Sequence, residues 1–91
     1  MALGFSFTPS GFTPEKYDET VSRLEAAGAG APAGRLYHVA LESEGLVQVF
    51  DVWESQESFE AFGGTLLPIM GELGVDPGQP MVASVRNTIQ G

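Results

Sequence analysis

The sequence predicts an α+β fold in which a four-stranded antiparallel sheet carries two helices on one face. A length of 91 residues fits one domain, spanning residues 1–91. Short segments near both ends and in the middle are rich in β-branched and aromatic residues, and two longer segments repeat apolar residues at helical spacing. The resulting order, β-α-β-β-α-β, is the ferredoxin-like arrangement.

The first half of the chain supplies a strand, a helix and a hairpin. The strand covers residues 3–8 (LGFSFT), and the helix has Thr13 as its cap, Pro14 in its first turn and Gly28 at its end. Residues 28–34 (GAGAPAG) are a linker, because a phosphate-binding loop would lead into a helix and this one leads into a strand. A hairpin over residues 35–53 is expected to turn at residues 42–45 (ESEG).

The second half supplies a helix and a last strand. Ser55 is the expected cap of the helix, but Gly63, Gly64 and Pro68 are awkward inside one helix. We therefore expect a break or kink near residues 63–64, after which Thr65 caps a second helical segment. A loop (VDPGQP) and a strand over residues 81–89 (MVASVRNTI) complete the order.

Composition excludes several classes of function. The net charge of −8 disfavours binding to nucleic acid or to an anionic membrane surface. No segment has the length of apolar residues that crosses a bilayer, and no secretory signal is recognised. The lack of cysteine excludes disulfides and thiolate chemistry and suits a reducing compartment, so a cytoplasmic location is expected.

Both faces of the predicted hairpin are apolar, so both need a cover. One face contains Leu36, His38, Ala40, Val47, Val49, Asp51 and Trp53. The other contains Tyr37, Val39, Leu41, Leu46, Gln48, Phe50 and Val52. We expect the helices to cover the second face and another copy of the chain to cover the first. Such a homodimer through the sheet face would enclose an apolar cavity between two sheets.

His38 and Asp51 are the candidate catalytic residues. A symmetric turn places them diagonally across the hairpin, where their side chains could meet. An Asp that accepts from one imidazole nitrogen leaves the other to act as base or acid. The simpler alternatives are a packed His with locally satisfied nitrogens and an Asp that caps the following helix. The candidate substrate-binding residues are Trp53, Leu36, Ala40, Val49 and Arg86, although Trp53 could simply fill the dimer core and Arg86 could form a salt bridge.

The run VQVFDVWESQESFEAF, residues 47–62, resembles the antibiotic biosynthesis monooxygenase-like proteins of the dimeric α+β barrel superfamily. The resemblance extends over nearly the whole chain in element order and implies a homodimer. It also implies an activity among cofactor-independent monooxygenases, cyclases, isomerases and haem-degrading enzymes. Trp53 matches a cavity-facing Trp of the monooxygenases. Val49 stands where those enzymes have Asn, and Arg86 stands where similar sequences often have His.

These observations predict a small homodimeric enzyme that transfers protons on a hydrophobic aromatic or polyketide-like molecule, in the manner of a cofactor-independent monooxygenase. No cofactor is expected. One His with scattered carboxylates does not predict a metal site, and haem ligation by His38 ranks low because few basic residues could hold its propionates. The alternatives are a cyclase or isomerase of the same fold, a non-catalytic or stress-related module that binds a small ligand, and a structural dimer with a filled interface.

Overall fold

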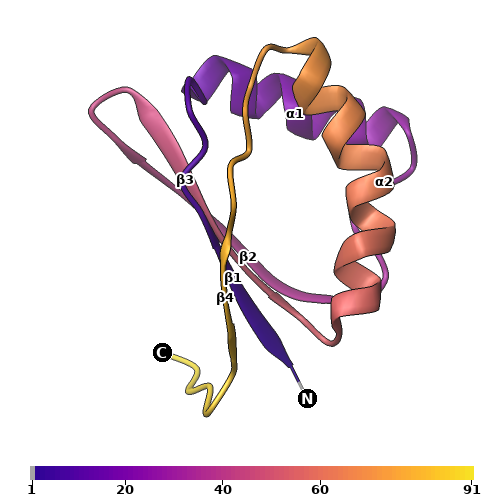
Figure 1. Cartoon of the computed structure of the whole chain (residues 1–91), viewed down its shortest axis with the longest axis vertical. Helices are drawn as coiled ribbons and strands as arrows, with labels where there is room; N and C mark the ends of the chain where they lie inside the picture. Colours follow the sequence, from indigo (N-terminus) through magenta and orange to yellow (C-terminus); the bar gives the residue numbers. More distant parts are fainter. Residues whose placement is uncertain (1) are drawn as a thin grey trace.

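The computed structural model describes residues 2–91 and confirms the ferredoxin-like fold. The sheet has the strand order β2-β3-β1-β4, and its neighbouring strands are antiparallel. Both helices lie on one side of it (Figure 1). The elements are β1 (Leu3–Phe7), α1 (Pro14–Ala26), β2 (Arg35–Ser43), β3 (Leu46–Trp53), α2 (Gln56–Glu72) and β4 (Met81–Ser84).

Helix α1 forms as its sequence signals indicate. The side chain of Thr13 accepts a hydrogen bond from the Lys16 backbone N–H at 3.3 Å, and Pro14 occupies the first turn, where its missing N–H has no cost. After the helix ends, Gly28 has a φ of 79°, a conformation that glycine adopts without strain. The buried side chains of Thr20 and Leu24 mark the face that packs toward the sheet.

The β2–β3 hairpin has a tighter turn than expected. Glu44 and Gly45 both have positive φ, 54° and 78°, which is the pattern of a two-residue hairpin loop. Ser43 therefore pairs with Leu46, and the expected pairing of Leu41 with Leu46 is wrong by two residues. A shift of two leaves every side chain on its expected face, because side chains alternate with a period of two.

A β-bulge at the start of β2 changes one face assignment. Arg35 pairs with Trp53 and Tyr37 pairs with Val52, so Leu36 is the extra residue between them. Arg35 consequently shares the face of Trp53, where an unbroken ladder would have placed Leu36. Leu36 is instead 61% exposed.

Helix α2 is continuous, so of the two expected alternatives the break near residues 63–64, with a second segment capped by Thr65, is wrong. Ser55 caps it as expected, accepting from the Ser58 N–H at 3.1 Å, but the helix then runs without interruption through Pro68. The N–H that proline lacks would have bonded the carbonyl of Gly64. Both residues are exposed, so water can satisfy that carbonyl and the cost is small. At the other end of the chain, β4 stops at Ser84 and residues 85–91 leave the sheet on the side away from the helices (Figure 1).

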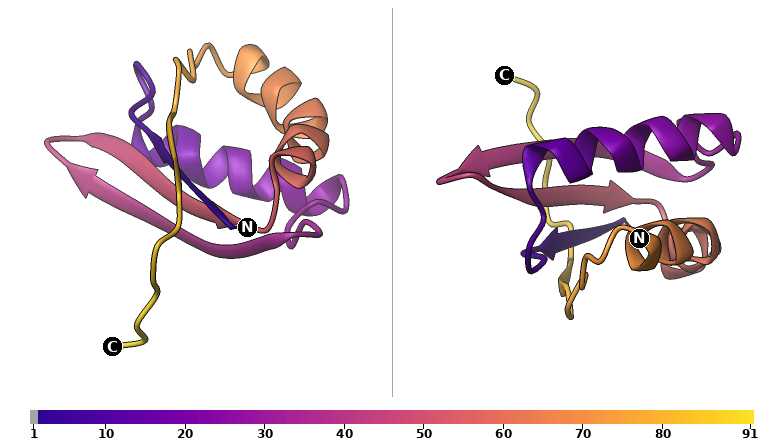
Figure 2. Two further views of the ribbon diagram at one scale, coloured as in Figure 1. Left: turned by 60° about the horizontal axis from the view of Figure 1, so that its bottom comes forward. Right: turned by 90° about the horizontal axis from the view of Figure 1, so that it is seen from above.

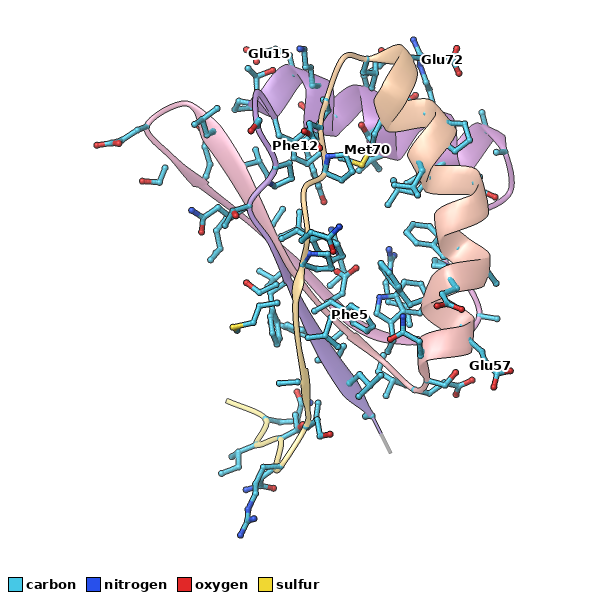
Figure 3. The ribbon with its side chains drawn as sticks, in the orientation of Figure 1. Phe5, Phe12, Glu15, Glu57, Met70 and Glu72 are labelled. Atoms are coloured by element: carbon cyan, nitrogen blue, oxygen red, sulfur yellow. The ribbon has the colours of Figure 1, made fainter. Side chains whose placement is uncertain are left out.

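The helices cover the opposite sheet face from the one we expected. Trp53 and Phe5 are fully buried, and both belong to a core cluster with Phe62 and Ile69 of α2. A second cluster contains Phe12 and Met70, and Figure 3 shows Phe5, Phe12 and Met70 inside the space between sheet and helices, while Glu15, Glu57 and Glu72 point outward. The face with His38, Asp51 and Trp53 is therefore the covered one. Figure 2 shows that the axes of the two helices over that face run in clearly different directions.

The other sheet face is bare in the single chain. It carries large apolar side chains that are 39–69% exposed: Tyr37, Leu41, Leu46, Phe50 and Met81. Both hairpin faces are apolar, as predicted, but the helices cover the face that we expected to lie against a second copy. The physical reason is that both faces are about equally apolar, so alternation alone does not distinguish them. Within residues 2–91, no helix has the length and apolarity that a bilayer span requires.

Candidate functional site

A cavity of about 520 Å³ lies between the sheet and the helices of the single chain. This location corrects the expectation of a cavity between two sheets, and it follows from the reversed face assignment. The walls come from β1, α1, β2, β3 and α2 and are mostly apolar, with Phe7, Phe12, Val21, Phe59, Leu66 and Met70 among the lining residues. A volume of this size accommodates a small aromatic molecule.

His38 and Asp51 meet in the wall of this cavity. The tight turn places them directly opposite each other, not diagonally, and His38 Nδ1 lies 2.5 Å from Asp51 Oδ1. The Asp51 side chain is only 5% exposed, and its second oxygen accepts the indole N–H of Trp53 at 3.3 Å. Two donors therefore satisfy a buried carboxylate, as a buried charge requires. The same bonds fix the imidazole with its proton on Nδ1.

Tyr17 of α1 extends this pair into a hydrogen-bonded series of Tyr17, His38 and Asp51. Its hydroxyl lies 2.8 Å from His38 Nε2, and the planes of the two rings are nearly parallel, at 3°. Because Nδ1 donates to Asp51, Nε2 accepts the Tyr17 proton. The hydrogen bonds thus run in one direction, from Tyr17 through His38 to Asp51, and Tyr17 also lines the cavity.

The pKa of the Tyr17 hydroxyl is raised by its surroundings. Burial raises the pKa of Tyr17 above its ordinary value of 10.0, and the carboxylates of Asp51 and Asp18 raise it further. The positive charge of Arg35 acts in the opposite direction. Tyr17 is therefore a protonated phenol at neutral pH and can donate its proton to His38.

The predicted site residues have different positions relative to the cavity. His38, Asp51 and Val49 line it, and Trp53 lies behind Asp51 in the core. Two predicted residues of β2 do not line it: Ala40 packs against the second core cluster, and the bulge exposes Leu36. Arg86 lines a separate groove of about 220 Å³ with Phe50 and Asn87.

Two cavity residues, Tyr17 and Arg35, were not among the predicted site residues. Tyr17 lies on the apolar stripe of its helix. The signal that could have identified it is its hydroxyl group, because this stripe packs against a sheet face that carries His38. Arg35 enters the cavity through the bulge, for which the sequence has no turn or glycine signal.

The described residues offer no obvious metal site. In residues 2–91, no group of three or more His, Cys, Asp or Glu side chains is arranged to hold a metal ion. Both nitrogens of His38 already have partners within the chain.

The fold is similar to that of several solved structures. The cofactor-independent oxygenase SnoaB from Streptomyces nogalater has a TM-score of 0.62 and 19% identity, over 97% of this chain and 94% of that chain. A putative antibiotic biosynthesis monooxygenase from Chloroflexus aurantiacus has a TM-score of 0.61 and 16% identity, over 98% and 95% of the two chains. A second one, from Deinococcus radiodurans, has a TM-score of 0.61 and 11% identity, over 99% and 97%.

Sequence comparison adds no relative to these structural ones. No family model matches the chain, and a search of curated proteins finds no match either. The fold is nevertheless the one that the strand-to-helix junction of residues 47–62 indicates. The chain has the ferredoxin-like fold of the antibiotic biosynthesis monooxygenase-like proteins.

Proposed function

We propose that this protein is a small enzyme that removes a proton from an aromatic or polyketide-like substrate in its apolar cavity, in the manner of a cofactor-independent monooxygenase. The observation that carries the proposal is the hydrogen-bonded series of Tyr17, His38 and Asp51 in the wall of that cavity. A titratable series at the edge of an apolar pocket is the arrangement that proton transfer needs. The described oxygenase of the same fold supports the choice of reaction class.

The geometry suggests how the proton moves. The Tyr17 oxygen takes a proton from an activated carbon or hydroxyl of the substrate while its own proton passes to His38 Nε2. The imidazolium that forms is paired with Asp51. Because the Tyr17 hydroxyl is hydrogen-bonded to His38 Nε2, the substrate contacts the phenol of Tyr17 and not the imidazole. His38 is the final acceptor of the proton, which it receives from Tyr17.

The substrate anion then reacts with molecular oxygen. For an activated CH₂ group, the anion gives one electron to O₂, and the resulting pair combines into a C–O bond that takes up the proton as a hydroperoxide. Loss of water leaves a carbonyl, so one oxygen atom enters the product and the other leaves with both hydrogens of the carbon. The apolar walls protect the electron-rich anion from bulk water.

Cyclisation and isomerisation begin with the same proton removal, so a cyclase or isomerase of this fold is the first alternative. The second is a module that binds a small ligand without turnover, and one observation favours it. The polar groups of the series satisfy one another, and no buried side-chain polar atom among residues 2–91 lacks a partner. Such a network also serves simply to anchor β2, β3 and α1.

The proposal includes a homodimer that forms through the bare sheet face. The exposed side chains of Leu41, Phe50 and Met81 on that face support this part, since a contiguous apolar face of a sheet favours association. The cavity lies within one chain, so catalysis does not require the dimer. We also propose a cytoplasmic location, because a chain without cysteine suits a reducing compartment.

The test combines ligand binding with oxygen uptake. Quinols, flavonoids and fatty acids are screened by the fluorescence of Trp53, which is the only tryptophan and bonds to Asp51. Oxygen consumption is then measured with each ligand that binds. Tyr17→Phe and His38→Ala should abolish uptake, while Tyr37→Phe, which removes an exposed hydroxyl from the bare face, should not. Binding without oxygen uptake or any other turnover would support the ligand-binding module instead.

A further inference from the structure

Arg35 is the one Lys or Arg among residues 2–91 that lines the cavity. It reaches the cavity because Leu36 is bulged out of the ladder, which puts Arg35 on the same face as Trp53, Asp51 and His38. The chain has only four Lys and Arg residues against twelve Asp and Glu residues. A Lys or Arg in this mostly apolar wall is therefore a specific feature of the site.

The guanidinium of Arg35 keeps most of its hydrogen-bonding capacity unused. One nitrogen, Nη2, donates to the Gly30 carbonyl at 3.2 Å, and the guanidinium carbon lies 5.8 Å from the ring centroid of Phe62. Within residues 2–91, the ion pairs are those of Arg23 and His38, and none involves Arg35. A guanidinium has five N–H donors in a planar fork that matches an anionic oxygen pair.

We propose that Arg35 binds an anionic oxygen of the substrate, a carboxylate or a phenolate, and so selects acidic aromatic molecules for the cavity. This inference rests on the proposed function and names the substrate class within it. Phe62 and the Gly30 carbonyl hold the guanidinium at the cavity wall, and the anion takes the remaining donors. The ring of the substrate then occupies the apolar volume, with its reactive atom at Tyr17.

The charges around the cavity agree with this assignment. The positive charge of Arg35 lowers the pKa of Tyr17, so its field reaches the hydroxyl at which the substrate anion forms. Glu60 also lines the cavity, but its carboxylate accepts from Gln56 on the exposed side of α2. The attraction for an anion therefore depends on direct contact with Arg35 and not on the general charge of the protein, which is negative.

Two fluorescent probes that differ by one charged group test the inference. N-phenylnaphthylamine is neutral, and anilinonaphthalene sulfonate carries the same two ring systems with an added sulfonate. Their dissociation constants are measured with the wild type, Arg35→Gln, Arg35→Lys and the control Arg23→Gln, which removes the same charge from an ion pair on α1. Gly63→Leu is included to locate binding, because an added Cβ at Gly63 meets no atom within 4 Å and the leucine side chain would take up part of the cavity volume.

We expect Arg35→Gln to raise the dissociation constant of the sulfonate probe about ten-fold or more, as loss of a charged hydrogen bond predicts. The dissociation constant of the neutral probe should change by no more than about two-fold. Arg35→Lys should retain part of the preference for the sulfonate probe, and Arg23→Gln should retain all of it. Gly63→Leu should weaken the binding of both probes. Equal weakening of both probes by Arg35→Gln would show a purely structural role and overturn the inference. Sulfonate binding that Gly63→Leu leaves unchanged would overturn it too, since the anion would then bind outside the cavity.

The inference and the proposed function fail in different ways. If the wild type binds the neutral probe with no preference for the sulfonate, the cavity remains a ligand site and only the role of Arg35 is overturned. If the wild type binds neither probe, the cavity does not take aromatic ligands and both are overturned.

Discussion

His38 lies directly opposite Asp51 across the β2–β3 ladder, with Nδ1 and Oδ1 2.5 Å apart. Trp53, two residues further along β3, donates to the other oxygen of the same carboxylate. The carboxylate thus joins a strand pair to the core tryptophan from a nearly fully buried position. Both oxygens of the Asp51 carboxylate accept a hydrogen bond, and its negative charge is paired with His38. An isosteric change to an amide therefore disrupts these interactions.

Asp51→Asn should destabilise the fold and abolish turnover. The amide presents one acceptor and one donor group, so either His38 or Trp53 faces a donor in place of an oxygen. We expect a loss of about 1–3 kcal/mol in the free energy of unfolding, the cost of leaving a buried donor without its acceptor. Urea unfolding measures it, with Asp18→Asn on the exposed face of α1 as the control. Equal stability of the two variants would contradict the role assigned to the Asp51 carboxylate.

The pKa of Tyr17 gives a second prediction. Tyr37→Phe leaves Tyr17 as the only tyrosine, and we expect its ultraviolet titration to have a midpoint above the ordinary 10.0, because burial disfavours the phenolate. Adding Arg35→Gln should move the midpoint further up, since the opposing positive charge is removed. A midpoint at or below the ordinary value would mean that water reaches the hydroxyl freely.

The same pKa has a consequence for stability. A pKa that is higher in the folded chain than in the unfolded chain means that folding favours the protonated phenol. This contribution is complete below the unfolded value near 10 and is lost as the pH rises through the folded value. Tyr37→Phe should therefore lose more stability between neutral and strongly alkaline pH than the double variant with Tyr17→Phe. Parallel pH profiles of the two would contradict the prediction.

The sequence was sufficient for the element order and for the grouping of His38, Asp51 and Trp53 on one face. The grouping was correct even though the turn was assigned four residues and has two, because the resulting shift of two preserves alternation. Which face the helices cover could not be read, since both hairpin faces are apolar. The choice depends on how α1 and α2 fit the side chains, for example Phe62 against Trp53.

Two features of the site depend on tertiary contacts that no local pattern records. The bulge at Leu36 places Arg35 in the cavity without any glycine or proline to signal it. Tyr17 contacts His38 only because α1 crosses the sheet at that point, and the two residues are 21 positions apart. The continuity of α2 through Gly64 and Pro68 is similar, since packing of the Phe62 and Ile69 side outweighs weak local propensity.

A substitution at Gly63 affects both the stability of helix α2 and the volume of the cavity, because Gly63 lies in the helix and lines the cavity. Gly63→Ala should raise the free energy of unfolding by about 0.5–1 kcal/mol, because alanine loses less backbone entropy in a helix and the new Cβ meets no atom within 4 Å. The methyl group also narrows the cavity, so N-phenylnaphthylamine should bind more weakly. Gly71→Ala in the same helix is the control, since it lies outside the cavity wall and should stabilise without changing binding. Unchanged probe binding in both Gly63→Ala and Gly63→Leu would argue against occupancy of this cavity.

The bare sheet face predicts a homodimer, and it predicts that a charged substitution on this face disrupts the dimer. Leu41 is 58% exposed on the bare face, and burial of such a side chain contributes about 1.5–3 kcal/mol in each copy of a symmetric dimer. Leu41→Glu should therefore convert a dimer into monomers in sedimentation velocity at micromolar concentration. Leu67→Glu, on the helix layer, adds the same charge at a residue that is 53% exposed and should leave the dimer intact. The oxygen uptake of a monomeric Leu41→Glu variant should persist, because the series from Tyr17 to Asp51 lies within one chain. A wild type that sediments as a monomer would remove the dimer from the proposal and leave the cavity chemistry to be judged on its own.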